Sequence, residues 1–220
     1  MKIIFISGLG YDHRIFNKLS FNEFEVVYLD WIEPNLNEDM KEYAARLGSS
    51  LSKINDSVIL VGHSFGGLIA QEIASIHKIE EVILLSSIVS RREMPLWIRT
   101  IKPCGLHRLP IRKWSSNSVG FWGKLHGFDT KEKKDLFRNM VNRYSDHYFQ
   151  WALRELSLWK GAEVPETTKL FQINGTRDRT FPIKNIEKPD YIIENGSHIF
   201  TLEVPGILSA LIKNEVQQWV

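Results

Sequence analysis

A serine flanked by glycines stands where two sequence patterns meet. Residues 58–61 form an unbroken apolar run typical of a strand buried on both faces, and apolar residues recur at helical spacing from Leu68 onward. Between them lies Gly62-His-Ser64-Phe-Gly66, which predicts a strand-to-helix turn whose strain only small neighbours tolerate. Amides at the start of such a helix can stabilise an oxyanion. The pattern indicates nucleophilic acyl transfer at Ser64; the alternative is a glycine-rich turn with a chance serine.

A nucleophilic serine needs a base, and the base needs an acid that orients it. Of the seven histidines, only His198 lies in a loop just after a late predicted strand. Asp178 lies in a turn, bounded by Gly175 and Pro182, that follows the preceding strand. We therefore predict Ser64 as nucleophile, His198 as base and Asp178 as orienting acid. The alternatives are an ordinary loop histidine and an aspartate that only caps its turn.

Other histidines receive different interpretations. His63 is adjacent to the serine but is predicted to point to the opposite side of the strand, where it packs or supports the site from behind. His13 follows the first loop and can approach the pocket, although a surface position is at least as consistent with the sequence. No histidines show the spacing of a zinc site, so we predict no metal.

These residues depend on a parallel sheet to bring the ends of their strands together. Buried runs predict strands at 2–7, 24–29, 57–63, 82–85, 169–173 and 190–193. Helical patterns lie between several of them, one beginning at an Asn37 N-cap and a final one with Pro205 in its first turn. This alternation predicts an α/β fold, with a mostly parallel sheet of about six strands and helices on both faces.

The alternation stops between about residues 89 and 165. This stretch carries five of the seven tryptophans, and its later half predicts helices at roughly 130–143 and 146–159. We predict a helical cap at 89–165, inserted into a core formed by 1–88 and 166–220. The tryptophans would form the interior of the cap or line a pocket above the serine, and Trp122 and Trp151 are the predicted pocket residues.

With these motifs the chain resembles a compact, cap-bearing, carboxylesterase-like member of the α/β-hydrolase superfamily. The resemblance covers nearly the whole length and rests on Ser7-Gly8-Leu9-Gly10, Gly62-His-Ser-Phe-Gly-Gly67, Gly175-Thr-Arg-Asp178 and Gly196-Ser-His198. The order Ser64, Asp178, His198 is that of the triad in this superfamily. The resemblance implies that the backbone amides of Leu9 and Phe65 form the oxyanion hole and that no cofactor is needed.

Three features depart from the usual pattern of that superfamily. Ser7-Gly8 stands where many members have His-Gly before the oxyanion residue. The chain also starts directly on the strand that is third in the full fold. The interval from Asp178 to His198 is short, which leaves little room for a full helix between the last two strands.

The resemblance implies a serine hydrolase that cleaves a small carboxylic ester or thioester through an acyl-enzyme. The alternative from another class is a hydrolase-fold receptor or pseudoenzyme that binds a ligand with little turnover. Seven Lys or Arg residues between Arg91 and Lys113, against the single acid Glu93, are consistent with an anionic or carrier-bound substrate. A solvated charged face is the slightly favoured explanation.

Composition sets the remaining expectations. A chain of 220 residues with 43% hydrophobic residues is long enough for one core, and a net charge of +2 gives no reason to expect nucleic acid or a membrane as partner. Cys104 is the only cysteine, which fits a reducing compartment. With no signal peptide or spanning segment in the sequence, we expect a cytoplasmic protein, and leave its oligomeric state open.

Overall fold

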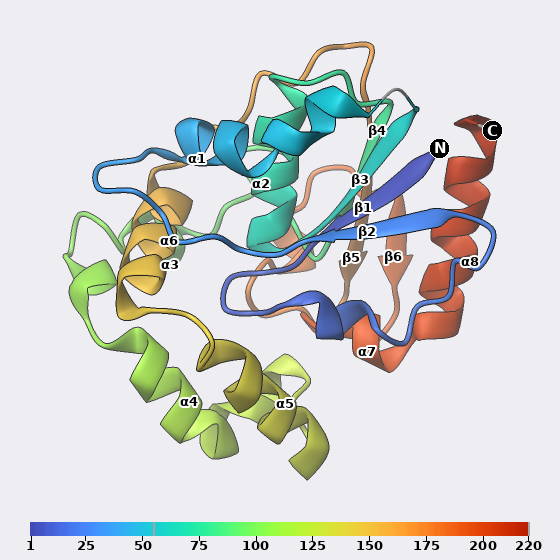
Figure 1. Cartoon of the computed structure of the whole chain (residues 1–220). Helices are drawn as coiled ribbons and strands as arrows, with labels where there is room; N and C mark the ends of the chain where they lie inside the picture. The colour runs from blue at the N-terminus through green and yellow to red at the C-terminus, as the bar shows by residue number, and fades with distance from the viewer. Residues whose placement is uncertain (55, 220) are drawn as a thin grey trace.

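A six-stranded sheet forms the centre of the computed structural model, which describes residues 1–54 and 56–219 (Figure 1). Its order is β2-β1-β3-β4-β5-β6, and every neighbouring pair of strands is parallel. The strands are β1 (Lys2–Ile6), β2 (Glu25–Leu29), β3 (Val58–His63), β4 (Glu81–Leu85), β5 (Lys169–Gly175) and β6 (Tyr191–Ile193). The predicted α/β fold with about six parallel strands is confirmed.

Burial follows the apolar pattern of each strand. Every residue of β3 and β4, at the middle of the sheet, is buried, as expected for continuous apolar runs covered on both faces. The edge strands β2 and β6 have residues that remain exposed. The serine that follows β3 is therefore attached to the most deeply buried part of the sheet.

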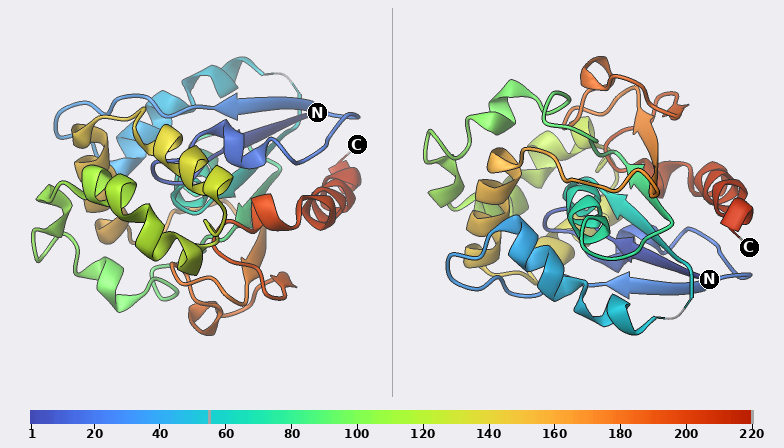
Figure 2. Two further views of the ribbon diagram at one scale, coloured as in Figure 1. Left: turned by 90° about the horizontal axis from the view of Figure 1, so that it is seen from below. Right: turned by 90° about the horizontal axis from the view of Figure 1, so that it is seen from above.

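Helices cover both faces of the sheet (Figure 2). On one face lie α1 (Met40–Leu47) and α2 (Phe65–Ala74), and on the other α7 (Phe200–Glu203) and α8 (Pro205–Val216). Pro205 stands in the first turn of α8, as predicted. Short 3₁₀ helices complete the described chain: η1 (His13–Phe16), η2 (Ser49–Lys53), η3 (Leu106–Arg108), η4 (Gly123–His126), η5 (Ile183–Asn185) and η6 (Gln217–Trp219). Between β5 and β6 the chain forms only η5, as the short interval led us to expect.

The start of α1 differs from the prediction. Its N-cap is Asp39, whose carboxylate accepts a hydrogen bond from the Glu42 amide while the Glu42 carboxylate accepts one from the Asp39 amide. Asn37 lies outside the helix with a φ of 63°, in the left-handed region that asparagine tolerates. The N-cap prediction at Asn37 is therefore wrong, because the reciprocal pair three residues apart at Asp39 and Glu42 provides two bonds.

Residues 86–168, between β4 and β5, are called the inserted segment below. They contain α3 (Leu96–Arg99), α4 (Ile111–Trp122), α5 (Lys131–Val141) and α6 (Asp146–Leu158), beside the carboxyl ends of the strands (Figure 1). The helices predicted at 130–143 and 146–159 correspond to α5 and α6, whereas α3 and α4 were not predicted. The division into a core and a cap at residues 89 and 165 stays a prediction.

A buried carboxylate fixes the start of the inserted segment to the sheet. The Glu93 side chain is completely buried. One of its oxygens accepts hydrogen bonds from the Val89 amide and the Gln172 side chain of β5, and the other accepts one from the Glu187 amide. These bonds satisfy a charge that would otherwise be costly to bury.

Three cations of the basic stretch at 91–113 hold the inserted segment together. Arg91 donates to the Trp159 carbonyl at 2.6 Å, and Arg99 donates to three carbonyls between residues 91 and 94. Arg112 pairs with Asp146 at 2.6 Å. Part of the basic stretch therefore has a structural role within the segment.

Candidate active site

β3 ends in a strained turn that carries Ser64. The serine has a φ of 53° and a ψ of −122°, a conformation that L-residues rarely adopt. Its amide donates to the Leu85 carbonyl at 2.9 Å, and the Ser87 hydroxyl donates to its carbonyl at 2.8 Å. Contacts from the end of β4 therefore hold the turn in place.

The glycines around the turn are required by its close packing. A Cβ atom at Gly66 would lie 2.2 Å from the Ser7 carbonyl oxygen, and one at Gly62 would lie 2.5 Å from the Gly67 Cα. Both distances are far below van der Waals contact, and the opposing atoms belong to the backbone. This agrees with the sequence argument that the turn needs small residues on either side of the serine.

The structure brings the three predicted residues together. The Ser64 hydroxyl lies 2.9 Å from His198 Nε2, and His198 Nδ1 lies 2.8 Å from an Asp178 carboxylate oxygen. The other Asp178 oxygen accepts hydrogen bonds from the amides of Thr180 and Phe181. A carboxylate can only accept, so His198 Nδ1 carries the proton and Nε2 is free to accept one from the serine.

All three side chains are shielded from solvent. Ser64, Asp178 and His198 are exposed by only 7%, 3% and 4%. Hydrogen bonds among charged or polar groups are stronger in such an environment than in water. The arrangement can therefore transfer a proton from the serine hydroxyl to the imidazole, with the carboxylate stabilising the charge that forms.

His63 supports this site from behind, in agreement with its sequence interpretation. It is fully buried, and its Nε2 lies 2.8 Å from the His198 carbonyl oxygen. Burial, with a smaller contribution from His198, lowers the pKa of His63 to about 3, so its ring is neutral near pH 7. Since a carbonyl only accepts, Nε2 must be the protonated nitrogen.

The loop after β1 places backbone groups beside the serine. A Cβ atom at Gly8 would lie 3.2 Å from the Ser64 Cβ, so the backbone there passes directly next to Ser64. In the described part of the chain the Leu9 amide has no hydrogen-bond acceptor. The Phe65 amide is in the first turn of α2, where amides lack intrahelical acceptors. Both predicted oxyanion donors thus remain available, and their role stays a prediction.

Contacts from the inserted segment hold the same loop. The Tyr144 hydroxyl donates to the Tyr11 carbonyl at 2.8 Å, and Arg143 pairs at 2.8 Å with Asp12, whose side chain is completely buried. Arg14 forms a second ion pair with that carboxylate, and these donors lower the pKa of Asp12 despite its burial. The loop that carries Leu9 is therefore attached to residues more than 130 positions away.

The two predicted pocket tryptophans lie in different surroundings. Trp151 is buried on α6, with its ring centroid 4.3 Å from that of Tyr43 and 6.0 Å from that of Phe65. Trp122, at the end of α4, is half-buried against Phe137. Neither Ser64 nor His198 lines any of the five described cavities, so the pocket role of these tryptophans stays a prediction.

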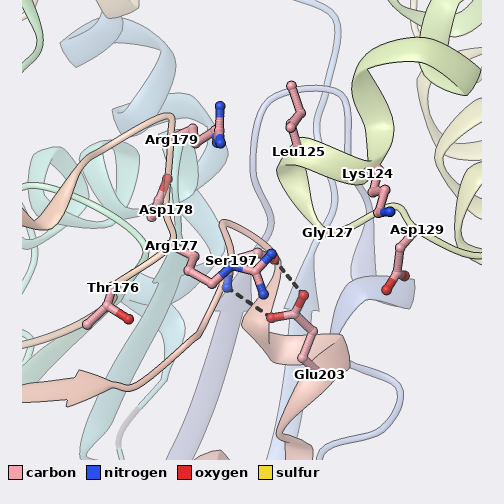
Figure 3. Close-up of a pocket in the computed structure, with 10 residues that line it drawn as sticks. All are labelled: Lys124, Leu125, Gly127, Asp129, Thr176, Arg177, Asp178, Arg179, Ser197 and Glu203. Atoms are coloured by element: carbon pink, nitrogen blue, oxygen red, sulfur yellow. Dashed lines mark hydrogen bonds between the residues drawn. The ribbon is translucent and has the colours of Figure 1, made fainter.

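A cavity of about 420 Å³ adjoins Asp178 (Figure 3). The turn at 176–179 lines one side and residues 124–129 of the inserted segment line the other. Its charged lining consists of three cations and three carboxylates: Lys124, Arg177, Arg179, Asp129, Asp178 and Glu203. With opposite charges in equal number, the cavity gives no electrostatic reason to expect an anionic substrate.

Several supporting residues were not identified from the sequence. Ser87, Arg143 and Tyr144 contact the site only because distant segments meet in the fold, and no local pattern marks them. His13 lies 3.5 Å from Asp30 with a partly exposed ring, on the surface rather than at the serine. Among the described residues, no cluster of His, Cys, Asp and Glu has the arrangement of a metal site.

Comparison with known proteins agrees with this fold. The sequence model of a family described as the alpha/beta hydrolase family matches residues 3–210. No curated protein matches the chain significantly by sequence.

Solved structures share the fold at low sequence identity. An esterase from Exiguobacterium antarcticum is 14% identical with a TM-score of 0.75, covering 99% of this chain and 92% of its own. MenH from S. aureus is 18% identical with a TM-score of 0.69, covering 99% and 94%. A structure from the thaumarchaeon Nitrososphaera gargenis, from work on carboxylesterases, is 17% identical with a TM-score of 0.71, covering 98% and 89%.

Proposed function

The chain belongs to the α/β hydrolase family, and we propose that it is a serine hydrolase cleaving a small carboxylic ester or thioester. The observation that carries this proposal is the unbroken chain of hydrogen bonds from Ser64 through His198 to Asp178. It joins a nucleophile, a base and an orienting acid on the ends of three different strands. The same order of residues along the chain is the one found on this fold.

In the first half of the proposed reaction, the Ser64 oxygen attacks the substrate carbonyl carbon while His198 Nε2 takes the hydroxyl proton. The charge on the carbonyl oxygen is stabilised by the amides of Leu9 and Phe65, each such donor lowering the barrier by on the order of 3 kcal/mol. Asp178 stabilises the imidazolium. The bond to the leaving group then breaks, and the departing alcohol or thiol takes the proton from Nε2.

In the second half, water attacks the acyl group that remains on Ser64. His198 Nε2 takes a proton from this water and returns it to the serine oxygen as the acyl bond breaks. A carboxylic acid leaves, and the hydroxyl is restored. The proton balance needs only the three side chains and water, with no cofactor.

We propose further that the inserted segment acts as a cap over the serine, with Trp122 and Trp151 on its pocket side. Two contacts, one of them made by Trp151, support the position of the segment over the serine. Trp151 packs edge to face on Phe65, the residue next to the nucleophile, and a Cβ atom at Gly10 would lie 2.7 Å from the Phe149 ring. Several proteins of similar structure are described as esterases, which supports an ester as the substrate class.

The test is labelling by a fluorophosphonate combined with hydrolysis of short p-nitrophenyl esters and acyl thioesters. Ser64→Ala should lose both labelling and turnover while keeping the wild-type melting temperature, and Ser50→Ala, on the exposed surface, should keep both. Asp178→Asn retains the shape of the carboxylate but favours the wrong imidazole tautomer, so turnover should fall by up to about 10⁴-fold.

Persistent labelling of Ser64→Ala would contradict the assignment of the nucleophile. A wild-type protein that is labelled but hydrolyses none of the esters or thioesters would overturn the proposal in favour of a ligand-binding protein. Near-normal turnover in Asp178→Asn would place the orienting acid elsewhere.

A further inference from the structure

The inserted segment exposes many large apolar side chains on its outer surface. Fourteen such side chains are exposed on the described chain, and seven of them lie between residues 96 and 125: Leu96, Trp97, Leu106, Leu109, Trp114, Phe121 and Leu125. These seven define the apolar patch. It lies on α3, η3, α4 and η4, and Figures 1 and 2 show α4 on the side of the molecule away from α8. Half of the exposed large apolar side chains are thus concentrated in this one stretch, and concentrated apolar exposure is a mark of a candidate binding surface.

The clearest part of the apolar patch is on α4. Trp114 and Phe121 are seven residues apart, so they lie on the same side of the helix, and they are exposed by 52% and 92%. The buried side chains of α4 are only Ser116 and Val119. Two of the three aromatic residues of α4 therefore face solvent, while Trp122 packs against Phe137, which is unusual for a helix that only packs on a core.

The stretch of chain that carries the apolar patch contains cations and no acids. Residues 94–128 contain six Lys or Arg residues and no Asp or Glu. Arg99 and Arg112 are bonded within the inserted segment, as described above. The remaining four are exposed, and none forms an ion pair with another described residue: Lys102, Arg108, Lys113 and Lys124. The surface thus combines apolar and aromatic side chains with positive charge.

We propose that this surface binds an anionic lipid membrane. Aromatic and aliphatic side chains insert at the boundary between headgroups and acyl chains, while Lys and Arg contact the phosphates. No described helix is long and apolar enough to cross a bilayer, so the contact is peripheral, with α4 lying along the surface. The near-neutral charge of the whole chain did not indicate this local positive charge, because the acids that balance it lie outside residues 94–128.

Charge and shape both favour lipid over other occupants. A two-fold dimer formed through the apolar patch would bring the four exposed cations of one copy close to those of the second copy, and none of the four has an ion-pair partner on the described chain to offset this repulsion. A specific protein partner usually anchors its aromatic contacts in pockets. None of the five described cavities is lined by Trp97, Trp114 or Phe121. A flat, charged bilayer needs no such pocket.

The test is flotation of the full-length protein with vesicles of phosphatidylcholine, with and without phosphatidylglycerol. We expect binding only to the vesicles that contain phosphatidylglycerol, a blue shift of tryptophan emission on binding, and weaker binding at high salt. The measurement needs no catalysis. Failure of vesicle binding is therefore distinguishable from failure of the proposed hydrolase activity.

Paired variants separate the two kinds of contact. Trp114→Ser combined with Phe121→Ser should weaken partitioning at least about tenfold through loss of apolar area. Lys113→Gln combined with Lys124→Gln should weaken it about 25-fold, since each cation near an anionic surface contributes a factor of about five. All four side chains are exposed, so the melting temperature should not change.

The controls are exposed side chains of the same kinds on other faces. Ile207→Ser on α8 and Lys78→Gln, before β4, should bind vesicles like the wild-type protein. A wild-type protein that binds neither vesicle type, or both equally, would overturn the proposal. So would controls that lose as much binding as the patch variants, or a patch-dependent dimer in solution without vesicle binding.

Discussion

His63 links Ser64 to His198, the proposed nucleophile and base, through the backbone. It directly precedes Ser64, and its Nε2–H donates to the carbonyl of His198 at 2.8 Å. Its other ring nitrogen, Nδ1, is buried without a hydrogen-bond partner in the described chain. The single donated bond is therefore the polar role of this ring, and we predict that it positions His198.

The expected loss of kcat can be worked out from the carbonyl that removal of the His63 donor would leave without a hydrogen bond. His63→Leu would bury the His198 carbonyl without a donor, at a cost of about 1 to 3 kcal/mol. The fold can relieve part of this cost only by moving residue 198, which displaces the imidazole from Ser64. If the same 1 to 3 kcal/mol appears in the barrier, kcat should fall by roughly 5- to 150-fold, with KM nearly unchanged.

His63→Gln is the matched variant, because its side-chain amide can donate to the same carbonyl. We expect it to recover most of the lost kcat. Since burial keeps the pKa of His63 at about 3, its ring stays neutral over the assay range of about pH 5 to 9, and the shape of the pH profile should not change in either variant.

The assay is steady-state hydrolysis of a p-nitrophenyl ester, beside urea unfolding of each variant. Full kcat in His63→Leu would refute the positioning role. Equal losses in the Leu and Gln variants would also refute it, because the effect would then come from packing and not from the hydrogen bond.

Three further predictions concern β4, the turn after β3 and the loop after β1. Burial, together with neighbouring Glu215, raises the pKa of Glu81 to about 7, above its unfolded value. The contribution of Glu81 to stability should therefore be fully present below about pH 4.5 and be lost as pH rises through 7. Urea unfolding between about pH 4.5 and 8 should therefore show that wild-type protein loses stability relative to Glu81→Gln as pH rises. Gly66→Ala should prevent folding, measured by circular dichroism, since its Cβ would overlap a backbone oxygen at 2.2 Å. Tyr144→Phe removes the bond to the Tyr11 carbonyl and should lower kcat by about 3- to 10-fold, measured with a p-nitrophenyl ester.

The strands and the strand-to-helix turn at Ser64 could be predicted because their signals are local. The run at 58–61 is apolar throughout, and Gly62 and Gly66 stand at the only spacing that such a turn accepts. Asp178 and His198 follow predicted strands directly, and parallel strands bring their carboxyl ends to one edge. Local patterns were therefore enough to predict residues that meet in the structure.

α3 and α4 could not be predicted by the same reasoning. Helices are recognised from apolar residues that face a core, but Trp97, Trp114 and Phe121 face solvent. Their spacing therefore did not indicate which side of the helix packs inward. The exposure of Trp114 and Phe121, which prevented the prediction of α4 from the sequence, also makes the outer face of α4 a candidate binding surface.

The attachment of the inserted segment to the loop after β1 is the least predictable feature, because it joins residues more than 130 positions apart. Asp12 is completely buried and has two cationic partners, Arg14 from its own loop and Arg143 from the inserted segment. Moving the segment without the loop would break the ion pair of Arg143 with Asp12 and the hydrogen bond from Tyr144. The buried Asp12 carboxylate would then keep Arg14 as its one cationic partner. Because removing a partner from a buried charge costs more than the pair itself contributes, the loop and the segment should move together. Any motion that opens the serine to a substrate would then also move the backbone that carries the Leu9 amide.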